Sequence, residues 1–154
     1  IHGDPKIDNI MIDTRTDRAV SIVDLDTVKP GLVQYDIGDC LRSSCNPLGE
    51  ETHEIDDVVF NLDLCEMILH GYLPEVNAFF TDADYAVVYD AVWCLAFEMS
   101  LRFFTDYLEG DVYFKVGYPS NNLMRAQVQI ALAESIAAQE DEIRDLVGAL
   151  RRSL

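Results

Sequence analysis

The chain has 154 residues, 49% of them apolar, which suits one compact domain with a single hydrophobic core. Its formal net charge of −17 repels nucleic-acid phosphates, so we expect no nucleic-acid partner. Free nucleotide is not excluded, because bound magnesium can turn an acidic cleft into a phosphate site.

The chain opens on an acidic loop followed by two short apolar runs. Ile10–Ile12 and Val20–Val23 are rich in β-branched residues and are separated by a polar segment, which predicts an antiparallel hairpin. Such pairing would bring Asn9, before the first strand, close to Asp24, after the second. We therefore expect residues 1–28 to form a catalytic loop and a metal-binding hairpin.

An aspartate with an asparagine five positions later and a second acidic pair after a hairpin is typical of phosphoryl-transfer loops. Asp4 would orient the acceptor hydroxyl and accept its proton. Asn9 and Asp24 would supply oxygen ligands to Mg²⁺. Lys6 could reach the transferred phosphate of ATP, or it could be an ordinary solvent-exposed lysine. Asp26 could add a metal contact or bind acceptor hydroxyls.

The rest of the chain is predicted to be mainly helical. After the break at Lys29–Gly31, the segment Gln34–Arg42 suggests irregular or helical structure. Apolar residues then recur at helical spacing after Thr52, a candidate N-cap. We expect residues 52–150 to form a helical substrate subdomain.

Two further helices are marked by their ends. Thr81 and Asp84 resemble a capping box that opens a long helix running to about Leu108 and stopping at Gly110. Ser120 or Asn121 could cap the last helix. The predicted fold class is α+β, mainly helical, with a small β-hairpin and catalytic loops packed on several helices.

Two features bear on the cellular compartment. The apolar stretch 85–104 contains Asp90, Glu98 and Arg102, which would be costly in a membrane-spanning helix, so we expect no membrane partner. The four cysteines show no paired metal-site spacing, and we interpret them as reduced thiols of a cytoplasmic protein.

Two charged residues outside the loop invite specific interpretations. Asp36 is expected to be structural and to bind neighbouring backbone amides. Arg102 lies among apolar residues, where burial without partners would be expensive. It either pairs with Glu98 or Asp106 on adjacent turns, or it faces a cleft, and its spacing leaves both open.

Several of these segments resemble known families. His2-Gly3-Asp4 through Asn9, with Val23–Asp26, resembles the aminoglycoside phosphotransferase and choline kinase superfamily, whose members share a protein-kinase-like fold. Residues 22–32, 35–39 and 99–115 look like the N-acetylhexosamine 1-kinase branch. Gly3 stands in the middle of the His-Gly-Asp triplet as in aminoglycoside and choline kinases, whereas that branch tends to have His-Asn-Asp.

This resemblance implies a particular enzyme. Residues 1–154 would form the C-terminal catalytic and substrate-binding lobe of a kinase that uses ATP and Mg²⁺. It would phosphorylate the anomeric hydroxyl of an N-acetylhexosamine and release the sugar 1-phosphate. By position, Arg102 and Tyr113 would hold the sugar, together with Asp4 and Asp26.

The resemblance also implies an N-terminal ATP-binding lobe as a partner, so the isolated 154-residue chain is expected to be inactive. A dimer formed through the exposed lobe surface is a further expectation. Two alternatives stay open. The chain could belong to a kinase of an aminoglycoside, choline or another small alcohol, or it could be a non-catalytic kinase-like binding module.

Overall fold

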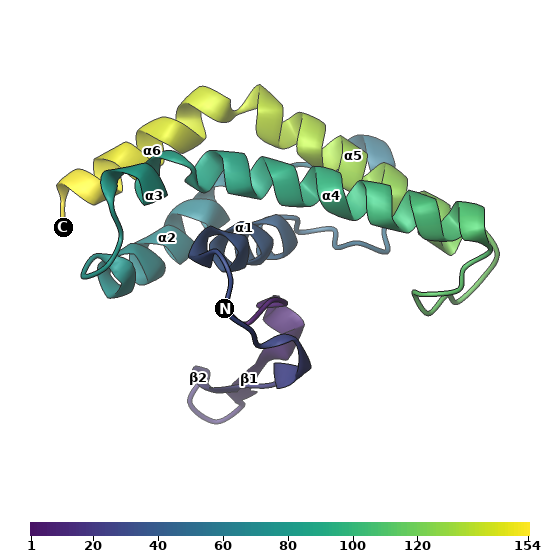
Figure 1. Cartoon of the computed structure of the whole chain (residues 1–154), viewed down its shortest axis with the longest axis horizontal. Helices are drawn as coiled ribbons and strands as arrows, with labels where there is room; N and C mark the ends of the chain where they lie inside the picture. Colours follow the sequence, from purple (N-terminus) through teal and green to yellow (C-terminus); the bar gives the residue numbers. More distant parts are fainter.

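The computed structural model describes residues 1–154 and shows a small N-terminal hairpin unit beside a larger layer of helices (Figure 1). The predicted fold class, α+β and mainly helical with one hairpin, is confirmed. The hairpin unit contains the 3-10 turn η1 (Ile7–Asn9), strands β1 (Ile10–Asp13) and β2 (Arg18–Ile22), and the 3-10 turn η2 (Leu25–Thr27). The helical part contains α1 (Val33–Ser44), the 3-10 turn η3 (Ile55–Asp57), α2 (Leu62–Val76), α3 (Asp82–Ala86), α4 (Val88–Glu109), α5 (Asn121–Ala138) and α6 (Glu140–Arg152).

The two strands pair antiparallel, as predicted, and the pairing sets the register of the acidic residues around them. Ile10 lies opposite Ile22 and Asp13 opposite Arg18, with an irregularity between Met11 and Ile12. Beyond the last pair, the amide of Val23 donates to the carbonyl of Asn9 at 2.9 Å. The hairpin therefore brings the end of the Asp4 loop next to the start of the Asp24 segment.

Helix α4 is the central element of the helical part. It packs against α1 and α5, while α2 packs against α6 and α1 (Figure 1). Helices α1, α4 and α5 each contain a pair of fully buried residues four positions apart, which places the two residues of a pair on one helical face. These pairs are Ile37 and Leu41 in α1, Val92 and Ala96 in α4, and Val128 and Leu132 in α5.

The signals at the two ends of the long helix behave as predicted, but its interior does not. Thr81 and Asp84 form a capping box, and Gly110 ends α4 in the left-handed conformation at φ 92°. Between them, the chain leaves helical geometry at Val87, so the expected single helix is two, α3 and α4. The packing of α3 on α6 favours this change of direction, which the local sequence does not encode.

Two other helix boundaries were predicted wrongly. The hydroxyl of Thr52 accepts the amide of Glu54 in a local turn, and α2 begins later, with Asn61 accepting the amide of Leu64. The expected last helix is broken at Gln139, whose side chain donates to the carbonyls of Phe60 and Ser135. Both corrections involve polar side chains that bind the backbone and so compete with a continuous helix.

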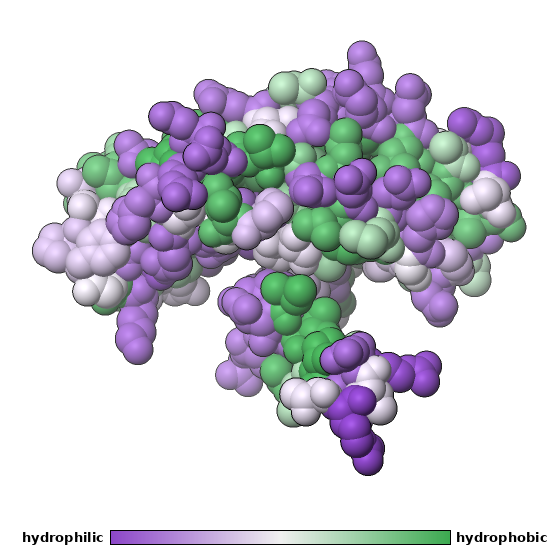
Figure 2. Space-filling model, turned by 180° about the vertical axis from the view of Figure 1, so that it is seen from behind, coloured by the Kyte–Doolittle hydropathy of each residue, from purple (hydrophilic) through white to green (hydrophobic).

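Apolar side chains lie exposed on the hairpin unit, as Figure 2 shows from behind. Val20, Leu25, Val28 and Leu32 are all more than half exposed. An exposed apolar surface of this kind could form the expected dimer contact, and dimerisation stays a prediction. No helix in the structure has the length and apolar character needed to cross a membrane.

The closest approach between α1 and α4 occurs at a glycine. A Cβ atom on Gly38 would lie 2.8 Å from the Cδ1 of Leu95 and 2.9 Å from the carbonyl oxygen of Ala91. Real side chains essentially never approach so closely, and Ala91 presents backbone that cannot rotate away. Gly38 therefore fixes the spacing between the helix that borders the Asp4 loop and the helix that carries Arg102.

We predict that Gly38→Ala lowers the free energy of unfolding by about 1–3 kcal/mol, because the added methyl group overpacks the α1–α4 contact. Gly71→Ala is the matched control, since Gly71 lies in α2 with nothing within 4 Å of the added methyl. That change should be neutral or stabilising by up to about 1 kcal/mol. Urea unfolding of both variants measures the difference, and equal stabilities would contradict the proposed tight packing.

Candidate active site

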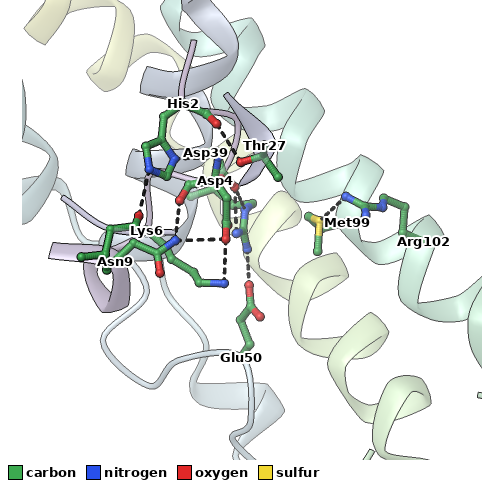
Figure 3. A network of polar contacts seen from close by, with 11 residues as sticks. His2, Asp4, Lys6, Asn9, Thr27, Asp39, Glu50, Met99 and Arg102 are labelled. Carbon is green, nitrogen blue, oxygen red and sulfur yellow. Dashed lines mark hydrogen bonds and ion pairs between the residues drawn. The ribbon is translucent and has the colours of Figure 1, made fainter. Parts of the chain in front are cut away.

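Asp4 is the hub of the loop that precedes β1. Lys6 approaches the Oδ2 of Asp4 with its Nζ at 2.9 Å (Figure 3). The Nδ2 of Asn9 donates to the backbone oxygen of Asp4 at 2.8 Å and to its Oδ2 at 3.1 Å. The structure therefore brings together three residues that the sequence singled out, with one carboxylate oxygen of Asp4 left free of these contacts.

The loop is attached to the helical part through Asp36, which lies in the first turn of α1. Its Oδ2 accepts the amide of His2 at 2.7 Å, and its Oδ1 accepts the amide of Gly3 at 2.9 Å. The structural role predicted for Asp36 is confirmed. Gly3 is in the left-handed region at φ 88°, and a Cβ there would lie 2.9 Å from the carbonyl oxygen of Thr27, so a larger residue would not fit without a shift.

His2 is engaged by the backbone on both ring nitrogens. Its Nδ1 accepts the amide of Asp4 at 3.3 Å, so Nε2 carries the hydrogen and donates to the carbonyl of Val23 at 3.1 Å. These bonds connect the Asp4 loop to the exit of β2. They occupy both ring nitrogens, which favours a structural role for His2 over proton transfer.

Asp24 follows Val23 directly and adopts the left-handed conformation at φ 62°. This conformation is uncommon outside glycine, although aspartate tolerates it better than most residues. Strained backbone of this kind gathers at functional sites. Because the amide of Val23 binds the carbonyl of Asn9, Asn9 and Asp24 lie at the same end of the hairpin, as the metal-site hypothesis requires.

A cleft of about 560 Å³ connects the Asp4 loop with the far end of α4. Asp4 and Lys6 from the loop before β1 line it, together with Arg102 of α4 and Tyr113. Asn9, Asp24 and Asp26 are not among its lining residues, so the metal site and the contact of Asp26 with the acceptor stay predictions. Several other lining residues were not predicted as site residues: Tyr35, Glu50, Phe114, Lys115 and Arg125. Tyr35, Phe114 and Lys115 lie in segments that carry the family resemblance, whereas no local motif marks Glu50 or Arg125.

Arg102 pairs with neither Glu98 nor Asp106, and it faces the cleft. Its Nη1 lies 3.5 Å from the Sδ of Met99, one turn earlier in α4 (Figure 3). Its guanidinium carbon lies 5.9 Å from the ring centre of Tyr113 and 5.4 Å from that of Phe114. Contacts of this length are weak cation–π interactions, which leave the guanidinium donors available to a ligand.

A buried ion network underlies the cleft. Arg42, 3% exposed, binds Asp39 through Nε at 2.9 Å, Glu50 through Nη1 at 2.5 Å and Gln129 at 3.1 Å. Burial acts to lower the pKa of Arg42, but the carboxylates of Glu50 and Asp39 outweigh it and raise the net pKa. Arg42 therefore stays charged and joins α1 to the segment before α2 and to α5.

Positive charge is concentrated in this cleft. Six of the chain's 11 lysines and arginines line it: Lys6, Lys29, Arg42, Arg102, Lys115 and Arg125. Three of these, Lys29, Arg102 and Lys115, make no ion pair, whereas Arg125 is paired with Glu51. In a chain with a net charge of −17, such a concentration favours an anionic ligand.

Lys6 remains protonated beside Asp4. Burial acts to lower the pKa of Lys6, but the Asp4 carboxylate outweighs it, and Glu50 and Asp24 add smaller contributions that raise the net pKa. The ammonium group is therefore charged throughout the neutral range.

The oxygen atoms at the hairpin end suit magnesium. No cluster of three or more histidine, cysteine or acidic side chains forms a complete metal centre. The Nδ2 of Asn9 donates to Asp4, so the Oδ1 of Asn9 is left as a neutral oxygen ligand. Asp24 offers an anionic oxygen ligand. Magnesium commonly takes one or two protein ligands and completes its octahedron with phosphate oxygens and water, so this donor set fits it.

Residues 1–57 match the model of the phosphotransferase enzyme family. The matched part contains the Asp4 loop, the hairpin, α1 and Glu50. This match supports a relationship to the aminoglycoside phosphotransferase and protein-kinase-like superfamily, and it supports an enzyme of the kinase type. Arg102 and Tyr113 lie outside it, so the resemblance to N-acetylhexosamine 1-kinases stays a prediction.

We predict that Asp36→Ala releases the Asp4 loop, because the amides of His2 and Gly3 lose their only acceptor. Those two amides should exchange with solvent at least about tenfold faster, with a loss of unfolding free energy near 1 kcal/mol. Hydrogen exchange measures this. Asp8→Ala, which removes an exposed carboxylate of η1 that makes no hydrogen bond, is the control, and equal exchange in the two variants would contradict the anchoring role.

Proposed function

We propose that this chain carries the catalytic residues of an ATP-dependent small-molecule kinase acting on the anomeric hydroxyl of an N-acetylhexosamine. The products would be the sugar 1-phosphate and ADP. The observation that carries this proposal is the shared cleft, where Asp4 and Lys6 face Arg102 and Tyr113. A phosphoryl-transfer loop and a polar acceptor wall then border one volume of the size that a small sugar needs.

Asp4 would act on the acceptor hydroxyl. Lys6 and Asn9 both bind its Oδ2, which fixes the carboxylate and leaves Oδ1 to receive a hydrogen bond from the sugar. As the oxygen–phosphorus bond forms and the bond to ADP breaks, the hydroxyl proton would pass to Asp4. A strong base is not required, because deprotonation can lag in a loose transition state.

Asn9, Asp24 and Lys6 would act on the phosphate side. Asn9 and Asp24 would hold Mg²⁺, which when bound would neutralise negative charge on the phosphates. Lys6, held charged beside Asp4, would contact the transferred phosphate. Lys29, which lines the same cleft without an ion pair, adds positive charge for the nucleotide.

Arg102 and Tyr113 would orient the sugar. The guanidinium fork of Arg102 is free of carboxylate partners and can donate to ring hydroxyls or to the acetamido carbonyl. The ring of Tyr113 offers a flat apolar face with a polar tip. Asp26 would accept hydrogen bonds from the acceptor, a role that rests on the sequence because Asp26 does not line the cleft.

The unpaired cations also bear on the alternative acceptors. Aminoglycosides and choline carry positive charge, and Arg102 and Lys115 at the acceptor end would repel them. A neutral sugar avoids this cost. A non-catalytic module is disfavoured because Asp4, Asn9 and Asp24 are all present and gather at one end of the hairpin.

We predict that the gene product containing this chain phosphorylates N-acetylglucosamine or N-acetylgalactosamine with ATP and Mg²⁺, and that Asp4→Asn lowers kcat by about 10²–10⁴-fold. Asp8→Asn, a charge-matched change outside the cleft, should leave kcat unchanged. A coupled ADP-release assay over a panel of N-acetylhexosamines, aminoglycosides and choline measures this. Retained activity in Asp4→Asn would remove the role of Asp4, and a preference for the cationic acceptors would overturn the sugar assignment.

We predict that Arg102→Met raises the acceptor KM about tenfold or more and leaves the ATP KM unchanged. A hydrogen bond from a charged donor is worth about 1.5–3 kcal/mol, which sets this scale. Arg18→Met is the control, because Arg18 is an exposed arginine of β2 outside the cleft. Steady-state kinetics with each substrate varied in turn measures the effect, and parallel changes in both KM values would place Arg102 elsewhere in the mechanism.

A further inference from the structure

We propose that Asp106 is a positioning residue for the acceptor. Its carboxylate fixes the backbone of residues 111–115, here called the acceptor loop, and thereby sets where Tyr113 stands opposite Arg102. This inference rests on the proposed function, in which Tyr113 and Arg102 hold the sugar. The loop itself follows α4 and returns toward α5 (Figure 1).

Asp106 collects four hydrogen-bond donors from this region. Its Oδ1 accepts the amides of Val112 at 3.0 Å and Tyr113 at 2.8 Å. Its Oδ2 accepts the amide of Phe114 at 2.9 Å and the Nδ2 of Asn122 at 2.8 Å. Three consecutive amides of the acceptor loop therefore converge on one carboxylate that is only 3% exposed.

The Asp106 carboxylate also holds the acceptor loop at a fixed position relative to Arg102. Asp106 follows Arg102 by four positions in α4, so the two residues lie one above the other on the helix surface. The loop backbone is thus held by the turn of α4 next to the one that carries the guanidinium. Any shift of the carboxylate would change the distance between Tyr113 and Arg102.

Packing alone does not hold this loop. Val112 is 74% exposed and Tyr113 73% exposed, so neither is buried against the core. Phe114 makes two aromatic contacts, with its ring centre 4.6 Å from that of Phe103 and 4.8 Å from that of Tyr113. Because apolar burial is small at Tyr113, its place depends mainly on the polar anchor.

The Asp106 carboxylate is not needed to end the helix. Gly110 already terminates α4 in the left-handed conformation, and the amides of Gly110 and Asp111 bind the carbonyls of Tyr107 and Asp106. The side chain of Asp106 acts beyond these bonds, on the residues that line the cleft. Burial acts to raise the pKa of Asp106, but the amides of Phe114, Tyr113 and Val112 outweigh it and lower the net pKa, which keeps the carboxylate charged.

Asp106→Asn tests the anchor in the gene product containing this chain. The change replaces one acceptor oxygen by an NH₂ group that faces two N–H donors, so two of the four bonds are lost. Asp111→Asn is the matched control. Asp111 is in the left-handed region at φ 59°, where asparagine is tolerated, and its Oδ1 can still accept from Asn122.

The expected result has two parts. The amides of residues 112–114 should exchange at least about tenfold faster in Asp106→Asn than in Asp111→Asn. With N-acetylglucosamine as acceptor, the acceptor KM should rise about tenfold to a hundredfold while the ATP KM stays constant, because a shift of about 1 Å in a positioning group can cost 10²-fold. Asp106→Glu, which keeps the charge but moves it by one methylene, should show the same split if Asp106→Asn fails to fold.

The outcomes separate this inference from the proposed function. Unchanged exchange in residues 112–114 overturns the anchor, whatever the activity. Faster exchange with an unchanged acceptor KM, or with equal changes in both KM values, overturns the positioning role. A wild-type protein that phosphorylates no acceptor removes the proposed function instead, and the exchange rates then decide the anchor alone.

Discussion

The candidate site depends on the two hydrogen bonds that the carboxylate of Asp36 accepts from the amides of His2 and Gly3. The Asp4 loop has little apolar burial of its own, so these charge-assisted hydrogen bonds and the close fit of Gly3 to Thr27 determine where it lies. Asp36 belongs to α1, which approaches α4 closely at Gly38, and α4 carries Arg102. The two walls of the cleft are therefore related through one rigid helix pair.

Both walls use the same physical device. Asp36 gathers two amides on the phosphoryl-transfer side, and Asp106 gathers three on the side of Tyr113. In each case a carboxylate on a well-packed helix holds a loop that packing alone does not fix. This arrangement leaves the loop side chains exposed to the cleft while their backbone stays ordered, which suits groups that must meet a substrate.

The parts of the fold that could be predicted are those encoded by neighbouring residues. The hairpin, the capping box at Thr81 and the stop at Gly110 each follow from a short pattern whose partners lie within a few positions. The breaks at Val87 and Gln139 depend on contacts with distant segments, such as the bond from Gln139 to Phe60. The same limit explains the site: the residues of the Asp4 loop carry a motif, whereas Glu50 and Arg125 line the cleft only through tertiary packing.

The distribution of charge ties the chemistry to the fold. Lys29, Arg102 and Lys115 line one cleft and make no ion pair, although the chain has a net charge of −17. Arg42, which lines the same cleft, is by contrast buried and paired with Asp39 and Glu50. Unpaired positive charge in the cleft that Asp4 lines favours an anionic ligand such as phosphate. Its extension to Arg102 and Lys115 favours an acceptor that carries no positive charge of its own.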